Sequence, residues 1–198
     1  MHAAEQQRPD VARAREEWIA SQPLRDPGKL IFLDETGTST KMARLCGRSK
    51  CGKRLVCRVP FGHWKTITAI LALRTDGVIA PFAIDCAMNG NIFVEYVRQV
   101  LVPALRPGDT VIMDNLSSHK GEEVRELIEG AGAFLHYLPP YSPDLNPAEQ
   151  LISMVKANLR RAARRTVDEL FVQIGKALDA VTPTQCQNFI RNSGYVQT

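Results

Sequence analysis

The chain has 198 residues, of which 44% are hydrophobic, and a formal net charge of +4. This length indicates one domain, and the hydrophobic fraction excludes a disordered chain. No apolar run approaches the roughly 18 residues that span a bilayer, and the charged N-terminus lacks the apolar core of a signal peptide. We therefore expect a cytoplasmic protein without membrane contact, whose five cysteines, an odd number, stay as free thiols.

The positive charge is concentrated in two segments that contain no Asp or Glu. Residues 36–62 hold seven basic side chains and residues 156–165 hold five, which leaves a net charge of −8 on the rest of the chain. Two acid-free basic segments on an acidic body predict a polyanion partner, most simply nucleic acid. The alternative is ordinary solvated surface charge. The residues are Lys41, Arg44, Arg48, Lys50, Lys53, Arg54 and Arg58 in the first segment, and Lys156, Arg160, Arg161, Arg164 and Arg165 in the second.

The first half of the chain indicates a short helix and then three strands. The apolar run that begins at Lys29 is apolar on both faces, as a central strand is, and an Asp-Gly pair at 76–77 marks a hairpin turn. The basic segment 36–62 is expected to form loops with one short strand at Leu55–Val59. The other expected elements are a helix over 9–21 and strands over 29–34, 63–74 and 78–85.

The second half indicates alternating helices and strands. Residues 139–147 contain four prolines, which excludes regular structure there. Three strands in a row followed by this alternation predict an α/β fold with a mixed five-stranded sheet and helices on both faces. The expected helices cover 91–105, 120–131, 148–165 and 166–180, with a last short one from about 182, and the strands cover 110–114 and 133–138.

Three acidic side chains lie at element ends in this arrangement. Asp34 ends the first strand, Asp114 ends the fourth, and Glu149 begins the helix after the proline-rich segment. If the two strands are neighbours, the three carboxylates meet at one edge of the sheet, where their repulsion favours bound cations. Oxygen-only ligands suit Mg²⁺ or Mn²⁺, and two such ions can clamp the attacking and leaving oxygens of a phosphoryl transfer.

Each of these acids also has a purely structural explanation. Asp34 can cap the turn in DETG, Asp114 can cap the following helix, and Glu149 can interact with the positive end of its own helix. Because all three occur at compatible element ends, the pattern favours a metal site.

Three motifs, FLDETG, VIMDNLSSHKG and LPPYSPDLNPAEQ, carry a resemblance to a known family. In this order they resemble the DDE transposases of bacterial insertion sequences related to the mariner elements, from about residue 10 to residue 197. The resemblance implies a ribonuclease H-like fold, with Asp34, Asp114 and Glu149 as the catalytic and metal-binding triad for two Mg²⁺ or Mn²⁺ ions. The implied reaction is metal-dependent cleavage of DNA strands at the element ends, followed by strand transfer into target DNA.

The resemblance also implies an organisation and partners. Residues 1–28 would be an N-terminal helix and linker, and residues 29–198 the catalytic domain. We expect double-stranded DNA as a partner and a homodimer on that DNA. Because the family usually has helix-turn-helix units before the catalytic region, we also expect a separate helix-turn-helix subunit. The implied location is the chromosome in a bacterial cytoplasm. Two alternatives stay open: an inactive remnant that only binds DNA, and another ribonuclease H-like nuclease, which typically has a fourth acid.

Eight side chains are candidates for DNA contact. On a helical wheel, Lys156 and Arg160 share a side with Glu149, next to the apolar face of the helix. Asn115 and His119 follow the second carboxylate, and His119 can contact a phosphate, shuttle a proton or simply belong to the next helix. The eight candidates are Asn115, His119, Lys156, Arg160, Arg161, Arg164, Lys53 and Arg54.

Two weaker patterns in the first basic segment do not predict a site. GRSKCGKR, over residues 47–54, imitates a phosphate-binding loop, but Arg54 stands where that motif needs Ser or Thr. Cys46, Cys51 and Cys57 lack the C-x₂-C spacing of common zinc sites. We therefore expect neither a nucleotide nor a zinc ion there.

Overall fold

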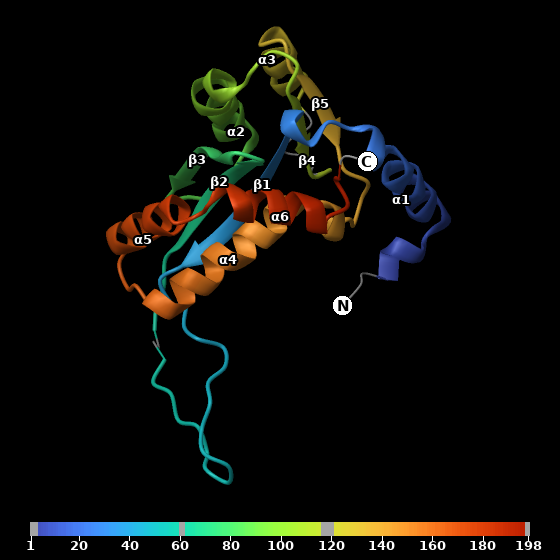
Figure 1. Ribbon diagram of the computed structural model, residues 1–198. Helices are drawn as coiled ribbons and strands as arrows, with labels where there is room; N and C mark the ends of the chain where they lie inside the picture. Colours follow the sequence, from blue (N-terminus) through green and yellow to red (C-terminus); the bar gives the residue numbers. More distant parts are fainter. Residues whose placement is uncertain (1–3, 60–61, 116–120, 197–198) are drawn as a thin grey trace.

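The computed structural model describes residues 4–59, 62–115 and 121–196 of the chain. At its centre is a five-stranded sheet with the order β3-β2-β1-β4-β5 (Figure 1). β1 is antiparallel to β2 and parallel to β4, whereas β3 is antiparallel to β2 and β5 is parallel to β4. The predicted mixed five-stranded sheet is therefore confirmed. Its strands are β1 (Leu30–Ser39), β2 (Thr66–Arg74), β3 (Gly77–Ile84), β4 (Thr110–Met113) and β5 (Phe134–Tyr137).

Helices cover both faces of the sheet, as the sequence predicts. One core contains side chains of α4, α5 and α6, and a second core contains those of α2 and α3. After α2 the chain continues helically, through a wider π turn, to Ala104. No helix in the described part of the chain has the length and apolar character needed to cross a membrane. The helices are α1 (Pro9–Ser21), α2 (Gly90–Tyr96), α3 (Glu122–Gly130), α4 (Pro147–Ala162), α5 (Val167–Asp179) and α6 (Pro183–Asn192).

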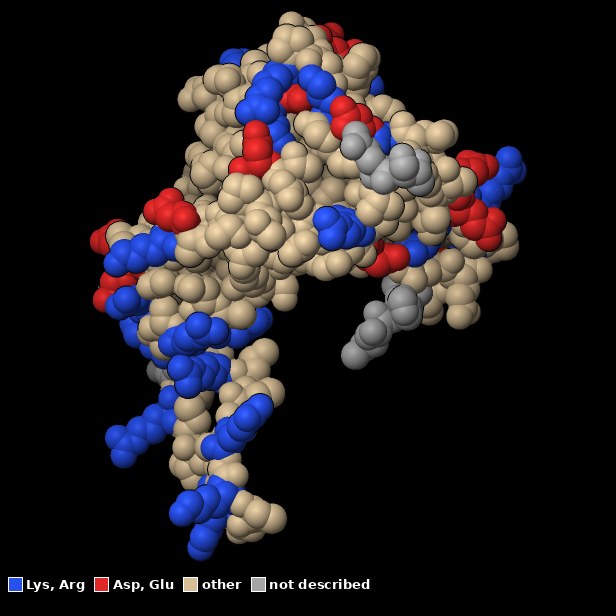
Figure 2. Space-filling view, in the orientation of Figure 1, with Lys and Arg blue, Asp and Glu red and all other residues tan. Residues whose placement is uncertain are grey.

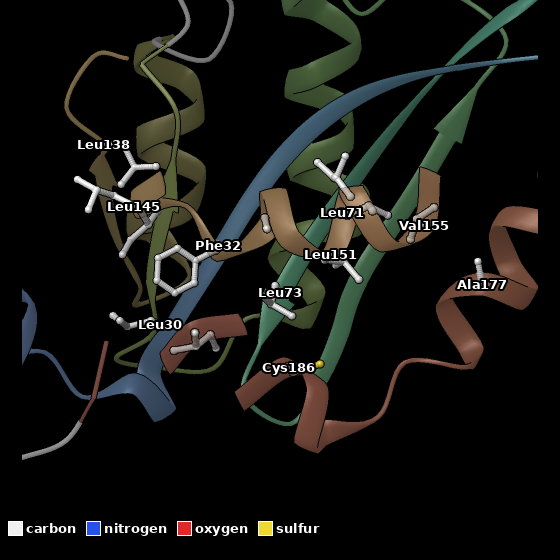
Figure 3. Packing of buried hydrophobic residues seen from close by; sticks show 14 of the residues in the cluster. Leu30, Phe32, Leu71, Leu73, Leu138, Leu145, Leu151, Val155, Ala177 and Cys186 are labelled. Atoms are coloured by element: carbon white, nitrogen blue, oxygen red, sulfur yellow. The ribbon is translucent and has the colours of Figure 1, made fainter. Parts of the chain in front are cut away.

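The alternation of side chains along β1 decides which residues face α4. Leu30 and Phe32 belong to the core beneath α4, whereas Ile31 and Leu33 belong to the core on the opposite face. Figure 3 shows Phe32 on the side of the sheet where α4 packs. Because successive strand residues point to opposite faces, Asp34 continues the series of Leu30 and Phe32 toward α4.

Helix α4 has clear start and stop signals and one apolar face. The side chain of Asn146 caps it by accepting a hydrogen bond from the backbone N–H of Ala148, and Pro147 occupies its first turn. It ends where Ala163 adopts a left-handed conformation with φ 52°. The apolar face that the sequence predicts is confirmed, since all four of its residues are buried: Leu151, Ile152, Val155 and Leu159.

Two predictions about the first basic segment are wrong. The first strand does not end at Asp34 but continues to Ser39, because β2 pairs with it as far as the Ser39–Thr66 pair. No strand forms at Leu55–Val59, although these residues are described. Their apolar side chains are exposed and have no core beneath them, and an isolated segment without a partner strand cannot form a stable ladder.

Residues 41–59 and 62–65, called the arm here, lie between the end of β1 and the start of β2 and extend past the C-terminal end of α4 (Figure 1). Backbone N–H of Thr40 donates to the carbonyl of Lys65 at 3.0 Å, which closes the base of the arm. Arg165, just after α4, donates from Nη1 to the carbonyls of Thr40 at 2.9 Å and Met42 at 3.0 Å. The two basic segments of the sequence therefore meet at the base of the arm.

A buried ion pair ties β2 to the entry of β4, at the opposite end of these strands from Asp114. Arg74 and Asp109 are only 2% and 1% exposed, and the guanidinium donates to the carboxylate. Asp109 also accepts a hydrogen bond of 2.7 Å from the backbone N–H of Arg106. The pair is enclosed by protein, so neither charge has water as an alternative partner.

We predict that Asp109→Asn lowers the free energy of unfolding by about 3–5 kcal/mol, because Arg74 then keeps a buried charge without its counterion. Urea unfolding measures the change. Asp76→Asn is the control, since the ion pair of Asp76 with Arg106 is exposed, and it should cost no more than about 1 kcal/mol. An equal loss of unfolding free energy in the two variants would contradict the prediction that the buried pair of Arg74 and Asp109 stabilises the fold more than an exposed pair.

Candidate active site

Asp34 and Asp114 each directly follow the last paired residue of two adjacent parallel strands, β1 and β4. The β1–β4 ladder ends at the pair of Leu33 and Met113, so each Asp follows directly. Neighbouring strands lie about 4.8 Å apart, and residues in register on parallel strands point to the same face. Both carboxylates are therefore directed to the face that α4 covers. Asp34 is 8% exposed, and Asp114 is half-buried.

The position of Asp34 differs from the sequence prediction in one respect. It lies in the middle of β1 instead of at its end, because β1 continues beside β2 after β4 has stopped. Because β4 is short, no described strand pairs with β1 beyond Leu33 on that side. The opening required at the carboxylates therefore comes from the end of β4 at Met113, and not from the end of β1.

Glu149 joins these carboxylates around one cavity. It lies in the first turn of α4 and is exposed. The cavity has a volume of about 410 Å³, and one of its walls is built by the proline-rich segment between β5 and α4. Its lining comprises Asp34, Asp114, Asn115, Leu138, Pro139, Pro140, Tyr141, Ser142, Pro143, Asn146 and Glu149. All three acids that the sequence predicts therefore line the same cavity.

The carboxylate of Asp34 is held by hydrogen bonds from two directions. Its Oδ1 accepts from the backbone N–H of Glu35 at 2.7 Å, and its Oδ2 accepts from Nδ2 of Asn146 at 3.0 Å. Asn146 is 3% exposed. The contact of Asn146 with Asp34 was not predicted from the sequence, although an Asn directly before Pro147 is a recognisable helix-cap signal.

The proline-rich segment is anchored by the N-terminal helix. Arg15 of α1 donates from Nη1 to Oγ of Ser142 at 2.8 Å and from Nη2 to Oδ2 of Asp144 at 2.6 Å. The hydrogen bond and charge of Asp144 raise the pKa of Arg15, so the guanidinium stays charged. Gln6 donates to the carbonyl of Tyr141 at 2.6 Å, and Tyr141 has a left-handed backbone with φ 56°. These contacts hold a strained segment beside the cavity.

A second anchor comes from the C-terminal end of the chain. The hydroxyl of Tyr195 donates to the carbonyl of Leu145 at 2.9 Å and accepts from Nε1 of Trp18 at 2.8 Å. Burial raises the pKa of the Tyr195 phenol, so this group stays protonated and can donate. The sequence carries no signal for these contacts, because Trp18, Leu145 and Tyr195 are far apart along the chain.

The carboxylates fit a divalent cation by their chemistry and by their shared cavity. Carboxylate oxygens are hard ligands of the kind that Mg²⁺ and Mn²⁺ prefer. Asp34, Asp114 and Glu149 are the residues that would hold such an ion. Within residues 4–59, 62–115 and 121–196, however, no three His, Cys, Asp or Glu side chains are gathered closely enough to form a ready metal site.

Seven of the eight candidate DNA contacts are among the described residues, and they lie in three places. Asn115 lines the cavity, and His119 lies outside the described residues. Lys156 and Arg160 are half-buried on α4, and at about 1.5 Å per residue Arg160 lies roughly 16 Å along the helix from Glu149. The remaining four are exposed, near the end of α4 or on the arm: Arg161, Arg164, Lys53 and Arg54.

The sheet order and the cavity at its centre define a class of fold, the ribonuclease H-like catalytic domain. Structures of Mos1 transposase share it: the paired-end complex with the left transposon end (TM-score 0.75, 14% identity) and the strand transfer complex (0.75, 15%). The catalytic domain of Mos1 mariner transposase matches with TM-score 0.67 and 14% identity. The matches cover 98% of this chain and 61%, 60% and 91% of those chains, respectively. The predicted fold is confirmed.

The family follows from the sequence itself. The model of the DDE superfamily endonuclease family matches residues 29–171, and the chain belongs to this family. No curated protein matches the sequence. The chain spans 61% of the Mos1 transposase chain in the paired-end complex, so it corresponds to part of that protein.

We predict that Arg15→Met loosens the proline-rich segment without unfolding the protein. The amide N–H groups of Leu145 and Asn146 donate to carbonyls inside this segment. Their hydrogen exchange should accelerate roughly 10-fold, because loss of a charge-assisted hydrogen bond destabilises the local structure by about 1–2 kcal/mol.

Arg13→Met is the matched control for this measurement. Arg13 lies on the same helix, but its ion pair with Glu17 is exposed and does not contact the proline-rich segment. Unchanged exchange in Arg15→Met, or equal acceleration in both variants, would contradict the anchoring role.

Proposed function

We propose that this chain is the catalytic domain of a transposase, which cleaves DNA strands at the ends of a mobile element and joins them to target DNA. One observation carries the proposal: a chain of the DDE endonuclease family has Asp34, Asp114 and Glu149 around one cavity. The described Mos1 complexes, with a transposon end and after strand transfer, support this reaction by analogy of fold. We further propose a bacterial insertion sequence related to the mariner elements as the source.

We propose that the three carboxylates bind divalent cations, two Mg²⁺ or Mn²⁺ ions. Mos1 paired-end complexes with Mg and with Mn support the choice of metal. Such ions lower the pKa of a bound water or hydroxyl and stabilise the charge that develops on phosphate oxygens. The protein supplies two oxygen ligands on the rigid central strands and a third on α4, and the buried backbone beneath Asp34 keeps that ligand in place.

The proposed DNA-binding surface runs from the cavity along α4 and onto the arm. Figure 2 shows Lys and Arg side chains along the arm and at its base, with no acidic side chain among them. In the sequence, no Asp or Glu occurs between Glu35 and Asp76. Arg165 joins the two basic segments at Thr40 and Met42. Basic side chains gathered in this way suit the phosphate backbone of a DNA duplex.

The arm also supports the proposal of a homodimer on DNA. Five of the eleven exposed large apolar side chains among the described residues lie on it, and none of the five belongs to either core: Leu45, Leu55, Val56, Val59 and Trp64. Exposed apolar side chains together with basic ones suit a second protein chain that lies beside DNA.

We propose that residues 29–198 form the catalytic domain and that residues 1–28 are an N-terminal helix and linker. A separate helix-turn-helix subunit would recognise the element ends. The reaction would take place on a bacterial chromosome in the cytoplasm.

We predict that Asp34→Asn, Asp114→Asn and Glu149→Gln each lower the rate of Mn²⁺-dependent nicking of supercoiled plasmid DNA by about 100-fold or more. Each variant loses one charged ligand while keeping the shape of the side chain. Removal of the metal with EDTA should abolish nicking by the unmodified protein. Nicking by Asp114→Asn at the unmodified rate would contradict the triad.

Glu35→Gln is the matched control, because Glu35 follows Asp34 in β1 and alternation directs it to the opposite face of the sheet. It should nick DNA at a rate within about two-fold of the unmodified protein, since it lies outside the cavity lining. A cleavage assay that compares duplex DNA of an element end with an RNA–DNA hybrid distinguishes a transposase from a hybrid-specific ribonuclease. Preference for the hybrid over duplex DNA would favour the ribonuclease.

We predict that the basic residues set the salt dependence of DNA binding. The plot of log K against log salt concentration has a negative slope, whose magnitude reflects the number of phosphates contacted. If each residue contacts one phosphate, this magnitude should fall by roughly 3 when Arg160, Arg161 and Arg164 are replaced together by Ala. It should fall by roughly 2 when Lys53 and Arg54 are replaced. Fluorescence anisotropy with a duplex oligonucleotide, titrated over a series of salt concentrations, measures the slopes.

A triple variant of equal charge provides the control. Arg13, Lys176 and Arg191 are exposed and lie outside both basic segments, so their replacement by Ala should change the slope by less than about 1. If this control lowers the slope as much as the α4 variant does, the binding is non-specific attraction to the whole protein and the proposed surface is wrong.

A further inference from the structure

Asn146 is bonded both to a carboxylate of the site and to the helix that carries another. Its Nδ2 donates to Oδ2 of Asp34 at 3.0 Å, and its Oδ1 accepts from the backbone N–H of Ala148 at 3.1 Å. Its carbonyl accepts from the backbone N–H of Glu149 at 3.2 Å. One residue therefore connects β1 to the first turn of α4, across the cavity that Asp34 and Glu149 both line.

The position of Asn146 is itself fixed by its surroundings. The residue is 3% exposed, and its backbone N–H donates to the carbonyl of Pro143 at 3.1 Å. The preceding residue, Leu145, is buried and receives the hydrogen bond of Tyr195 on its carbonyl. A buried side chain with these restraints has little freedom to leave its two partners.

Only an amide of this length serves both partners at once. The two roles need a donor toward Asp34 and an acceptor toward the N–H of Ala148, and the Asn amide has one group of each kind. Ser and Thr are good helix caps as well, and their hydroxyl can both donate and accept, but it is one atom on a shorter side chain and cannot occupy the positions of both Nδ2 and Oδ1 of Asn146. Capping alone therefore does not require Asn, whereas capping together with the contact to Asp34 does.

We propose that Asn146 is a positioning residue, which orients the carboxylate of Asp34 toward the cation and sets the distance between Asp34 and the start of α4. The inference rests on the proposed metal-dependent function. Groups that hydrogen-bond a metal ligand from behind fix its orientation, and their loss typically weakens metal binding or activity about 10- to 100-fold. Asn146 does not contact the reacting atoms in this role.

The test uses Asn146→Ser and Asn146→Thr, which keep a capping oxygen but are too short for their hydroxyl to reach the position from which Nδ2 of Asn146 donates to Asp34. Mn²⁺ binding is measured without DNA, by electron paramagnetic resonance of the free ion. The dissociation constant should rise about 10- to 100-fold, while the thermal midpoint in the absence of metal stays within a few degrees of that of the unmodified protein. In plasmid nicking, kcat should fall and KM for DNA should stay unchanged.

Asn89→Ser is the matched control. Asn89 caps α2 by accepting from the backbone N–H of Ile92 at 3.0 Å, and it does not line the cavity. This variant should bind Mn²⁺ as the unmodified protein does. Unmodified Mn²⁺ affinity in Asn146→Ser and Asn146→Thr would overturn the positioning role, and so would an equal loss in Asn89→Ser.

Failure of the proposed function gives a different result. If Asp34→Asn binds Mn²⁺ as tightly as the unmodified protein, the metal site is not at these carboxylates, and both proposals fall. If Asp34→Asn loses binding and the two Asn146 variants do not, only the positioning role is wrong.

Discussion

The parallel pairing of β1 with β4 is the constraint on which the site depends. Its register, with Leu33 opposite Met113, makes Asp34 and Asp114 neighbours on the same face of the sheet. A shift of one residue would turn one of the two carboxylates into the opposite core, because side chains alternate along a strand. The register is fixed by burial on both faces, since the residues before each Asp are apolar and almost fully buried: Leu30, Ile31, Phe32 and Leu33 in β1, and Val111, Ile112 and Met113 in β4.

The third carboxylate depends on a different kind of restraint. The segment that leads to Glu149 contains four prolines and forms few backbone hydrogen bonds of its own, so side chains from elsewhere hold it. Arg15 of α1 holds its Ser142 and Asp144, and Tyr195 holds Leu145. The two ends of the chain thus stabilise the segment between β5 and α4.

The sequence predicts the parts of this arrangement that depend on local patterns. The apolar run before Asp34, the helical spacing of Leu151 and Val155 and the motifs around Asp114 and Glu149 are enough to expect a mixed sheet with three carboxylates gathered at one edge. The apolar spacing also gives the buried face of α4 correctly. In each case the pattern lies within one short stretch of the sequence, and the element that it predicts forms from that same stretch.

The remaining features depend on contacts between distant segments. β1 continues to Ser39 through polar residues because β2 pairs with it, and Leu55–Val59 does not form a strand because nothing pairs with it. The contact of Arg165 with the base of the arm joins residues that are 125 and 123 positions apart, and Asn146 bonds to Asp34 over 112 positions. Such pairs have no periodic signature in a single sequence.

The proposed reaction depends on the binding of divalent cations by Asp34, Asp114 and Glu149 together. The most direct measurement is a crystal structure grown with Mn²⁺, in which anomalous scattering locates the ions. We predict two Mn²⁺ ions about 4 Å apart in the cavity, with carboxylate oxygens of Asp34, Asp114 and Glu149 as ligands. Manganese bound elsewhere on the chain, with this cavity empty at saturating Mn²⁺, would contradict it.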